Sequence, residues 1–129
     1  MPSLHGKAAV ITGSTSGIGK GIAEKLAARG ANIMLNGFGD REEIAELERQ
    51  LINDHGVKVG YSNADMSKPD EIRRLIGQAQ DAFGSVDVLV NNAGIQTVSP
   101  VDEFPEERWD AIIAINLSSA FHTTKAALP

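Results

Sequence analysis

Apolar and polar positions alternate in blocks along the chain, and these blocks predict strands and helices in turn. Short apolar runs at residues 8–11, 31–36, 57–61 and 86–90 each predict a strand. The run at 57–61 alternates apolar with polar residues, which is typical of a strand at a sheet edge. The segments between the runs carry apolar residues three and four positions apart, which is typical of amphipathic helices.

The ends of the predicted helices are marked by capping residues. The helix after the second strand begins at Asp40, which is spaced from Glu43 as a capping box, and it ends at Gly56. The next helix begins near Pro69, has the most regular apolar stripe in the chain, and ends at Gly84. These signals predict two complete amphipathic helices.

A long final helix is predicted to begin at Pro105. Asn116 lies on its apolar side, where an amide needs hydrogen-bond partners to offset the loss of water. We expect the buried side to consist of Trp109, Ile112, Ile113, Leu117, Ala120 and Phe121.

Strands that alternate with helices through short loops predict a parallel sheet with right-handed crossovers. We therefore expect an α/β fold, a Rossmann-type doubly wound sheet with strand order 3-2-1-4, in one domain over residues 1–129. In this order the chain reverses direction between strands one and four, and ligands bind outside the carboxyl ends of the strands there. The loops at 13–19 and 91–96 are predicted to share one ligand.

Three glycines in the first of these loops are spaced as in a phosphate-binding turn. Gly13 permits a positive φ, Gly17 lets a pyrophosphate approach the backbone, and Gly19 lets helix and strand pack closely. The helix N-terminus favours an anion, and the hydroxyls of Thr15 and Ser16 add donors, as does that of Ser14. A dinucleotide site is therefore indicated.

Two alternatives exist for this turn. A Gly/Ser turn without a ligand has the same composition and stays open. A Walker phosphate loop is excluded, because Gly21 follows Lys20 where Ser or Thr is required and Ser14 stands where the first glycine is required.

Composition narrows the classes of partner. The net charge of −5, from 12 basic and 17 acidic residues, argues against nucleic-acid and anionic-membrane surfaces and favours small-molecule partners. The chain has no cysteine, no membrane-spanning apolar run and no signal-peptide pattern, so we expect a cytoplasmic protein. His5, His55 and His122 show no metal-ligand spacing, and no metal is expected.

The segments TGSTSGIG at 12–19 and NNAG at 91–94, together with Asn116, resemble the short-chain dehydrogenase/reductase family. NGFGD at 36–40, NNAGIQ and the run from Phe104 to the end are similar to the D-3-hydroxybutyrate dehydrogenases within it. The resemblance covers the whole chain but only the N-terminal half of the family. It implies hydride transfer between NAD and a secondary alcohol or ketone, with 3-hydroxybutyrate and acetoacetate as the pair, in a homo-oligomer that is a tetramer.

The resemblance also implies roles for single residues. Asn116 matches a catalytic asparagine that helps to hold a water in a proton relay, and Gln96 matches a contact to the substrate carboxylate. Alternatives stay open: Asn116 as a structural amide, Gln96 and Asp65 as exposed loop residues, and NNAG as a simple turn. The implied cofactor contacts are Gly13, Thr15, Ser16, Gly17, Ile18, Gly19, Phe38, Asp65, Met66, Asn92, Ala93 and Gly94, with Phe38, Asp65 and Met66 at the adenine.

The choice between NAD and NADP rests on the end of the second strand, where an acid would bind the ribose 2′-OH. Asn36 stands there instead, and Asp40 is better explained as a helix cap. Ser16 and Gly37 offer no positive charge for a 2′-phosphate, although Arg41 could reach in. NAD is therefore favoured.

The catalytic groups that the resemblance implies are incomplete. The family reaction needs a Tyr, a Lys four residues later and a Ser, whereas the only tyrosine is Tyr61 and Asp65 stands four residues on. Two functional classes remain: the N-terminal part of a dehydrogenase, or a noncatalytic nucleotide-binding or assembly module. Other short-chain reductases, with 3-oxoacyl or sugar substrates, share this half. We favour the dehydrogenase, because VDVLV would otherwise be an exposed apolar edge.

Overall fold

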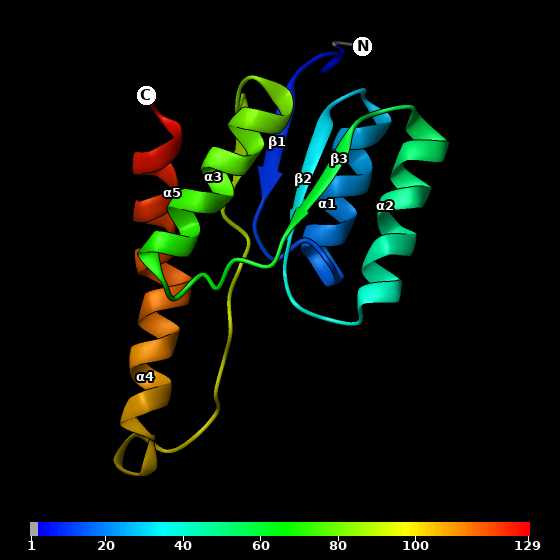
Figure 1. Ribbon diagram of the computed structural model, residues 1–129. Helices are drawn as coiled ribbons and strands as arrows, with labels where there is room; N and C mark the ends of the chain where they lie inside the picture. The colour runs from blue at the N-terminus through cyan, green and yellow to red at the C-terminus, as the bar shows by residue number, and fades with distance from the viewer. Residues whose placement is uncertain (1–2) are drawn as a thin grey trace.

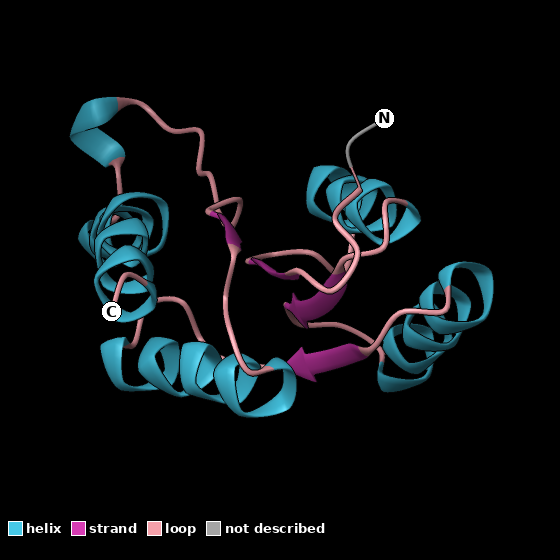
Figure 2. Cartoon of the chain, turned by 90° about the horizontal axis from the view of Figure 1, so that it is seen from above, coloured by secondary structure: helices cyan, strands magenta, loops and turns pink. Residues whose placement is uncertain are grey.

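The computed structural model describes residues 3–129 and shows a parallel sheet between two layers of helices (Figures 1 and 2). The strands are β1 (Ala8–Ile11), β2 (Asn32–Asn36), β3 (Val59–Ser62) and β4 (Val88–Val90). Their order is β3-β2-β1-β4, and all three pairings are parallel. The predicted fold, strand order and edge position of the third strand are confirmed.

Helices cover both faces of the sheet. Helices α1 (Gly17–Ala28) and α2 (Arg41–His55) lie on one face, and α3 (Pro69–Phe83) and α5 (Ser119–Ala127) lie on the other (Figure 2). Helix α4 (Glu106–Ile113) extends beyond the sheet and follows a short 3₁₀ turn, η1 (Val101–Glu103) (Figure 1). This arrangement leaves the carboxyl ends of the strands open between the helical layers.

The central strands carry the core because both of their faces are covered. Ala9 and Ile11 pack toward α1 and α2, whereas Val10 and Met34 pack toward α3. All four side chains are fully buried, as expected of a central strand with a period of two. The near-continuous apolar runs thus specify the middle of the sheet.

The predicted helix ends are confirmed where capping residues specify them. Asp40 Oδ1 accepts hydrogen bonds from the N–H groups of Glu42 at 2.7 Å and Glu43 at 3.3 Å. Gly56 ends α2 in the left-handed conformation, Gly84 ends α3 in the same way, and α3 begins at Pro69. Local sequence alone determines these boundaries.

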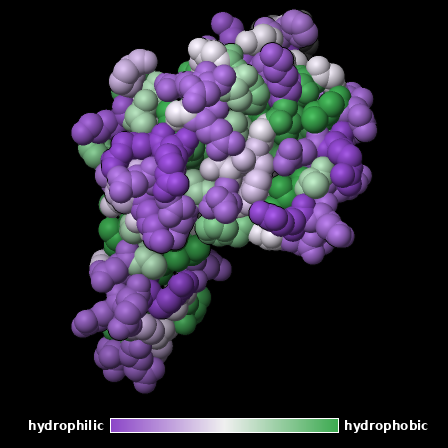
Figure 3. All heavy atoms as spheres, viewed as in Figure 1, coloured by the Kyte–Doolittle hydropathy of each residue, from purple (hydrophilic) through white to green (hydrophobic). Residues whose placement is uncertain are grey.

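The prediction for the final helix is wrong in two respects. A π-helical segment, η2 (Ala114–Ser118), separates α4 from α5, so the helix is not regular. Trp109, Leu117 and Phe121 are exposed instead of buried, and apolar atoms are visible along the projecting helix in Figure 3. Ile112, Ile113 and Ala120 are only partly buried.

The physical reason for the error lies in which side chains face the sheet. Ser119 and Thr123 are the buried residues of α5, and Ile115 and Ala126 pack beside them against the α3 layer. Ser119 Oγ donates to the Ile115 carbonyl at 2.5 Å inside the π-helical turn, a bond that bends helices. The buried side chains of α5 are thus the small hydroxyl residues, whereas the large Phe121 ring points outward.

Candidate functional site

The turn after β1 and the loop after β4 lie side by side at the carboxyl ends of the strands. Thr12 Oγ1 accepts hydrogen bonds from the N–H groups of Asn92 at 3.0 Å and Ala93 at 2.9 Å. Asn92 Nδ2 donates in return to the carbonyls of Thr12 and Gly13, both at 3.0 Å. The predicted proximity of the two loops is therefore confirmed.

The glycines of the first turn are required by this close contact. Gly13 has φ +63°, and a Cβ there would lie 3.0 Å from Ala93 Cα. A Cβ at Gly19 would lie 2.5 Å from Asn92 Nδ2 and would collide with the Gly13 carbonyl. Gly19 therefore lets helix α1 start directly behind the turn.

The N-terminus of α1 faces the open side of the turn and has the charge properties of an anion site. Ser16 is the N-cap residue, and its side chain makes no capping bond within the described chain. The first turn of the helix, GIGK, contains no acid that would offset the positive end of the helix dipole. A Cβ at Gly17 would meet no atom within 4 Å, so space lies beside this backbone.

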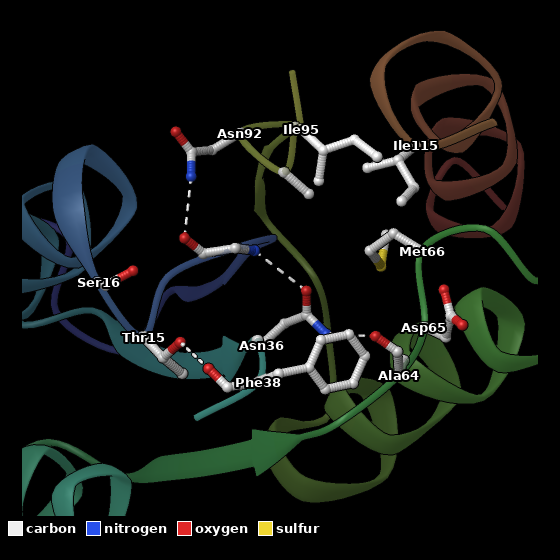
Figure 4. Close-up of a pocket in the computed structure, with 14 residues that line it drawn as sticks. Thr15, Ser16, Asn36, Phe38, Ala64, Asp65, Met66, Asn92, Ile95 and Ile115 are labelled. Carbon is white, nitrogen blue, oxygen red and sulfur yellow. Dashed lines mark hydrogen bonds between the residues drawn. The ribbon is translucent and has the colours of Figure 1, made fainter. Parts of the chain in front are cut away.

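Asn36, at the end of β2, connects the turn to the loop after β3 (Figure 4). Its Oδ1 accepts from Gly13 N at 3.1 Å, and its Nδ2 donates to the carbonyls of Ser62 at 3.2 Å and Ala64 at 3.1 Å. Asn36 is 1% exposed, so its amide makes its hydrogen bonds inside the protein.

The segment after Asn36 is held from two sides. Tyr61 Oη donates to the Gly37 carbonyl at 2.5 Å, and Thr15 Oγ1 donates to the Phe38 carbonyl at 3.3 Å. Burial raises the pKa of Tyr61, which keeps the phenol protonated and able to donate. The Phe38 ring is mostly exposed and lies at the rim of the cleft (Figure 4).

The loop after β3 brings one carboxylate and one thioether to the same cleft. Asp65 Oδ1 accepts from Ser67 Oγ at 2.7 Å and from Ser67 N at 2.9 Å. These bonds hold the pKa of the Asp65 carboxyl below its ordinary value of 3.8, so it is ionised at neutral pH. Met66 is buried beneath the loop and packs in the core on the α3 side.

These segments enclose a cleft of about 310 Å³, a volume near the small end of the range for ligand-binding clefts in proteins. Nine of the twelve predicted cofactor residues line it: Gly13, Thr15, Ser16, Phe38, Asp65, Met66, Asn92, Ala93 and Gly94. Gly17, Ile18 and Gly19 do not line it, since Gly17 and Ile18 lie exposed at the helix start and Gly19 lies behind the turn.

Sequence reasoning missed several residues of the lining. Asn36, Gly37, Ala64, Ile95 and Ile115 also line the cleft. Asn36 and Gly37 stand at the position on which the choice between NAD and NADP rests, and Ile95 lies in the loop predicted to share the ligand, but the sequence predicted no cofactor contact for any of the three. The others are small or apolar and carry no chemical signature in the sequence.

The two residues expected at the reaction centre lie next to this cleft and do not line it. Asn116 is in the π-helical segment η2, where its Oδ1 accepts from Ile95 N at 2.9 Å and its Nδ2 donates to Ile95 O at 2.8 Å. Gln96 is exposed, and Arg108 Nη2 donates to its carbonyl at 3.4 Å. Asn116 thus fixes the backbone one residue before Gln96.

A family model for short chain dehydrogenases matches residues 7–129 of this chain. The chain belongs to the short-chain dehydrogenase family. Its members are oxidoreductases that bind nicotinamide cofactors and act on small molecules.

The chain is similar in sequence to curated D-beta-hydroxybutyrate dehydrogenases from two organisms. The chain is 59% identical over 130 residues to a D-beta-hydroxybutyrate dehydrogenase of Cupriavidus necator, covering 98% of this chain and 48% of the relative. It is 52% identical to the enzyme of that name from Rhizobium meliloti, covering 95% of this chain and 48% of the relative. The chain spans about half the length of the curated relatives that it matches.

A solved structure of a blue fluorescent protein from a metagenomic library, in complex with NADPH, matches with a TM-score of 0.93. The sequences are 34% identical, and the match covers 98% of this chain and 51% of that chain.

Across residues 3–129 we find no helix with the length and apolar character to cross a membrane. The same residues bring together no group of three His, Asp or Glu side chains that could hold a metal ion.

Proposed function

We propose that this chain is the nicotinamide-dinucleotide-binding part of a dehydrogenase that interconverts a secondary alcohol and a ketone. The observation that carries the proposal is the pair of adjoining loops, with Gly13 and Asn92 in contact beside the acid-free N-terminus of α1. An open backbone at a helix N-terminus suits a pyrophosphate. The residues present therefore fit the cofactor.

The roles proposed for the individual residues follow their positions in the cleft. Thr15, Ser16 and Gly17 would hold the pyrophosphate, with Ile18 and Gly19 behind them at the start of α1. Phe38 and Met66 would border the adenine, and the Asp65 carboxylate would accept from its amino group. Asn92, Ala93 and Gly94 would line the ribose, and the bound nicotinamide would supply the hydride chemistry.

We propose NAD in preference to NADP. The described residues that line the cleft include no Lys or Arg, and their one charged side chain is Asp65. A 2′-phosphate would bring further negative charge toward this carboxylate, and Arg41, the cation that follows β2, acts on Tyr61 and does not line the cleft. The NADPH in the metagenomic protein belongs to that protein's own site.

For the whole protein we propose 3-hydroxybutyrate and acetoacetate as substrates, on the 59% and 52% identity to enzymes that bear that name. Gln96 is the proposed contact to the substrate carboxylate, and Asn116 is the proposed catalytic asparagine. The Tyr61 hydroxyl donates to the Gly37 carbonyl, and Asp65 instead of a Lys stands four residues later, so Tyr61 is not proposed as the acid. We also propose a cytoplasmic homo-oligomer.

Calorimetric titration of NAD into the protein and into Gly17→Val tests the proposal. Gly17 has φ +58° and open space beside it, so a valine strains the turn and fills the proposed pyrophosphate position. We expect the affinity to fall by about tenfold or more, the equivalent of one lost charge-assisted hydrogen bond.

The matched control is Gly21→Ala in the same helix, where a Cβ meets no atom within 4 Å and φ is not positive. It is expected to bind NAD as the parent protein does. Equal affinity in the parent and Gly17→Val would refute the assigned phosphate site, and no binding by the parent would refute the proposed function.

A further inference from the structure

Asn36 occupies the position from which an acid reads the ribose in many dinucleotide-binding folds, yet its side chain is turned into the protein. It is 1% exposed, and its amide makes three hydrogen bonds to backbone groups, with Gly13 N, Ser62 O and Ala64 O. An amide presents two donors and one carbonyl oxygen, and all of them have partners here.

The main chain of Asn36 strengthens the same connection. Its N–H donates to Ser14 Oγ at 3.0 Å, and its carbonyl accepts from Ser14 N at 2.6 Å. Residue 36 therefore bonds to the turn after β1 with backbone and side chain, and to the loop after β3 with its Nδ2. Gly13 and Ala64, which it joins, both line the cleft (Figure 4).

We propose that Asn36 is a positioning residue that sets the distance between the phosphate turn and the adenine loop, and that it does not read the ribose. The proposal rests on the proposed function, because it assumes that a dinucleotide spans both loops. Its consequence is specific: the choice between NAD and NADP is made by other groups, and the amide is needed for the affinity of both.

Replacement by aspartate separates this role from ribose recognition. Asn36→Asp has the same shape, so it creates no cavity, but its carboxylate only accepts hydrogen bonds and would face the Ser62 and Ala64 carbonyls. If residue 36 read the ribose, the acid would favour NAD over NADP. If it positions the loops, the acid weakens the binding of both nucleotides.

The experiment measures dissociation constants for NAD and NADP at neutral pH by calorimetry. For Asn36→Asp we expect both affinities to fall by about tenfold or more, as buried carbonyls lose their donors, with an unchanged NAD to NADP ratio. A rise of that ratio, or unchanged affinities, would overturn the proposal.

The matched control is Asn32→Asp at the other end of β2. Asn32 Oδ1 accepts from Lys58 N at 3.0 Å, and a carboxylate keeps that bond. This variant adds the same charge to the same strand outside the cleft, and we expect both affinities to stay at the parent values. An equal loss in Asn32→Asp would overturn the proposal, because charge alone would then explain the effect.

A pH profile tests the hydrogen-bond argument itself. The pKa of a buried carboxyl facing two carbonyls is raised, and its protonated form can donate to one of them. The nucleotide affinity of Asn36→Asp should therefore recover in part between pH 7 and pH 5, whereas the parent and Asn32→Asp should not improve. Absence of recovery would contradict the hydrogen-bond argument.

Asn36→Ser keeps the proposal testable if the aspartate variant does not fold. Serine is neutral and too short to reach both loops, so we expect a parallel loss of affinity for NAD and NADP. Parent-like affinities in this variant would overturn the positioning role. Failure of the parent to bind either nucleotide would refute the proposed function as well, whereas parent binding with unaffected variants would refute only the role of Asn36.

Discussion

Helices α3 and α5 pack on the same face of the sheet, but they bury opposite kinds of side chain. Helix α3 buries Ile72, Leu75, Ile76 and Ala79, whereas α5 buries Ser119 and Thr123 and leaves Phe121 exposed. Apolar spacing therefore predicts the buried face of α3 correctly and that of α5 incorrectly. The difference shows that a helix can approach a core through small polar residues if their hydroxyls find partners.

Those partners connect α5 to the site. Thr123 Oγ1 donates to Asn91 Oδ1 at 2.5 Å, directly after β4, and Ser119 Oγ donates to the Ile115 carbonyl. Upstream, Asn116 bonds both backbone groups of Ile95. One helical segment thus holds the loop after β4 by polar contacts, whereas α3 stabilises the fold by apolar burial.

The largest effect in this comparison is expected from truncating the α3 core. Leu75→Ala should lower the free energy of unfolding by about 2–5 kcal/mol, because the side chain is fully buried and a cavity remains. Urea denaturation measures the change. Phe121→Ala, although it removes more atoms, should cost less than about 0.5 kcal/mol because that ring is 61% exposed. Equal losses would erase the distinction between the two helices.

An intermediate effect is expected where α5 is buried. Thr123→Val keeps the shape but removes the hydroxyl, leaving Asn91 Oδ1 without its donor. The free energy of unfolding should fall by about 0.5–1.5 kcal/mol, the net contribution of one hydrogen bond, because Asn91 is exposed and its Oδ1 can bond to water instead. Denaturation with Thr124→Val as the control checks this, since Thr124 is exposed on the same helix. A stabilised Thr123→Val would show that α5 is held by apolar contact after all.

The smallest effect concerns the loop that leads into α3. The pKa of Asp65 is lowered by its bonds from Ser67, so its stabilising contribution is fully present above the ordinary value of 3.8 and is lost as pH falls through the lowered value. Thermal melting between pH 5 and pH 3 should show a shallower acid decline for Asp65→Asn than for the parent. Identical declines would mean that the Ser67 bonds contribute nothing to stability.

The sequence predicts a structural feature well when the feature follows from patterns within one segment, and poorly when it depends on hydrogen bonds between distant segments. The strand order, the Asp40 cap and the glycine turn follow from local patterns, and the structure has each of them. The role of Asn36 does not, because its partners Ser62 and Ala64 lie 26 and 28 residues away. From the sequence, residue 36 shows only that the end of the second strand lacks the acid that would bind the ribose.

The same limit applies to the predicted site. Nine of the residues predicted to bind the cofactor line the cleft, because they belong to loops that parallel strands place at one end of the sheet. The exposed side of α5 was not predicted, because apolar spacing indicates only a preferred face. The face that is buried depends on the partners of the hydroxyl groups, which are Asn91 after β4 and Ile115 in η2. Asn116 and Gln96 lie beside the cleft, and their catalytic roles stay predictions.

The central claim is that one dinucleotide lies between the turn after β1 and the loop after β4. Backbone amide NMR spectra recorded during an NAD titration test it most directly. We predict that the largest shifts fall on both segments together, at residues 13–19 and 92–95, with saturation at one equivalent. Shifts confined to one segment, or located at the opposite end of the sheet, would contradict the account.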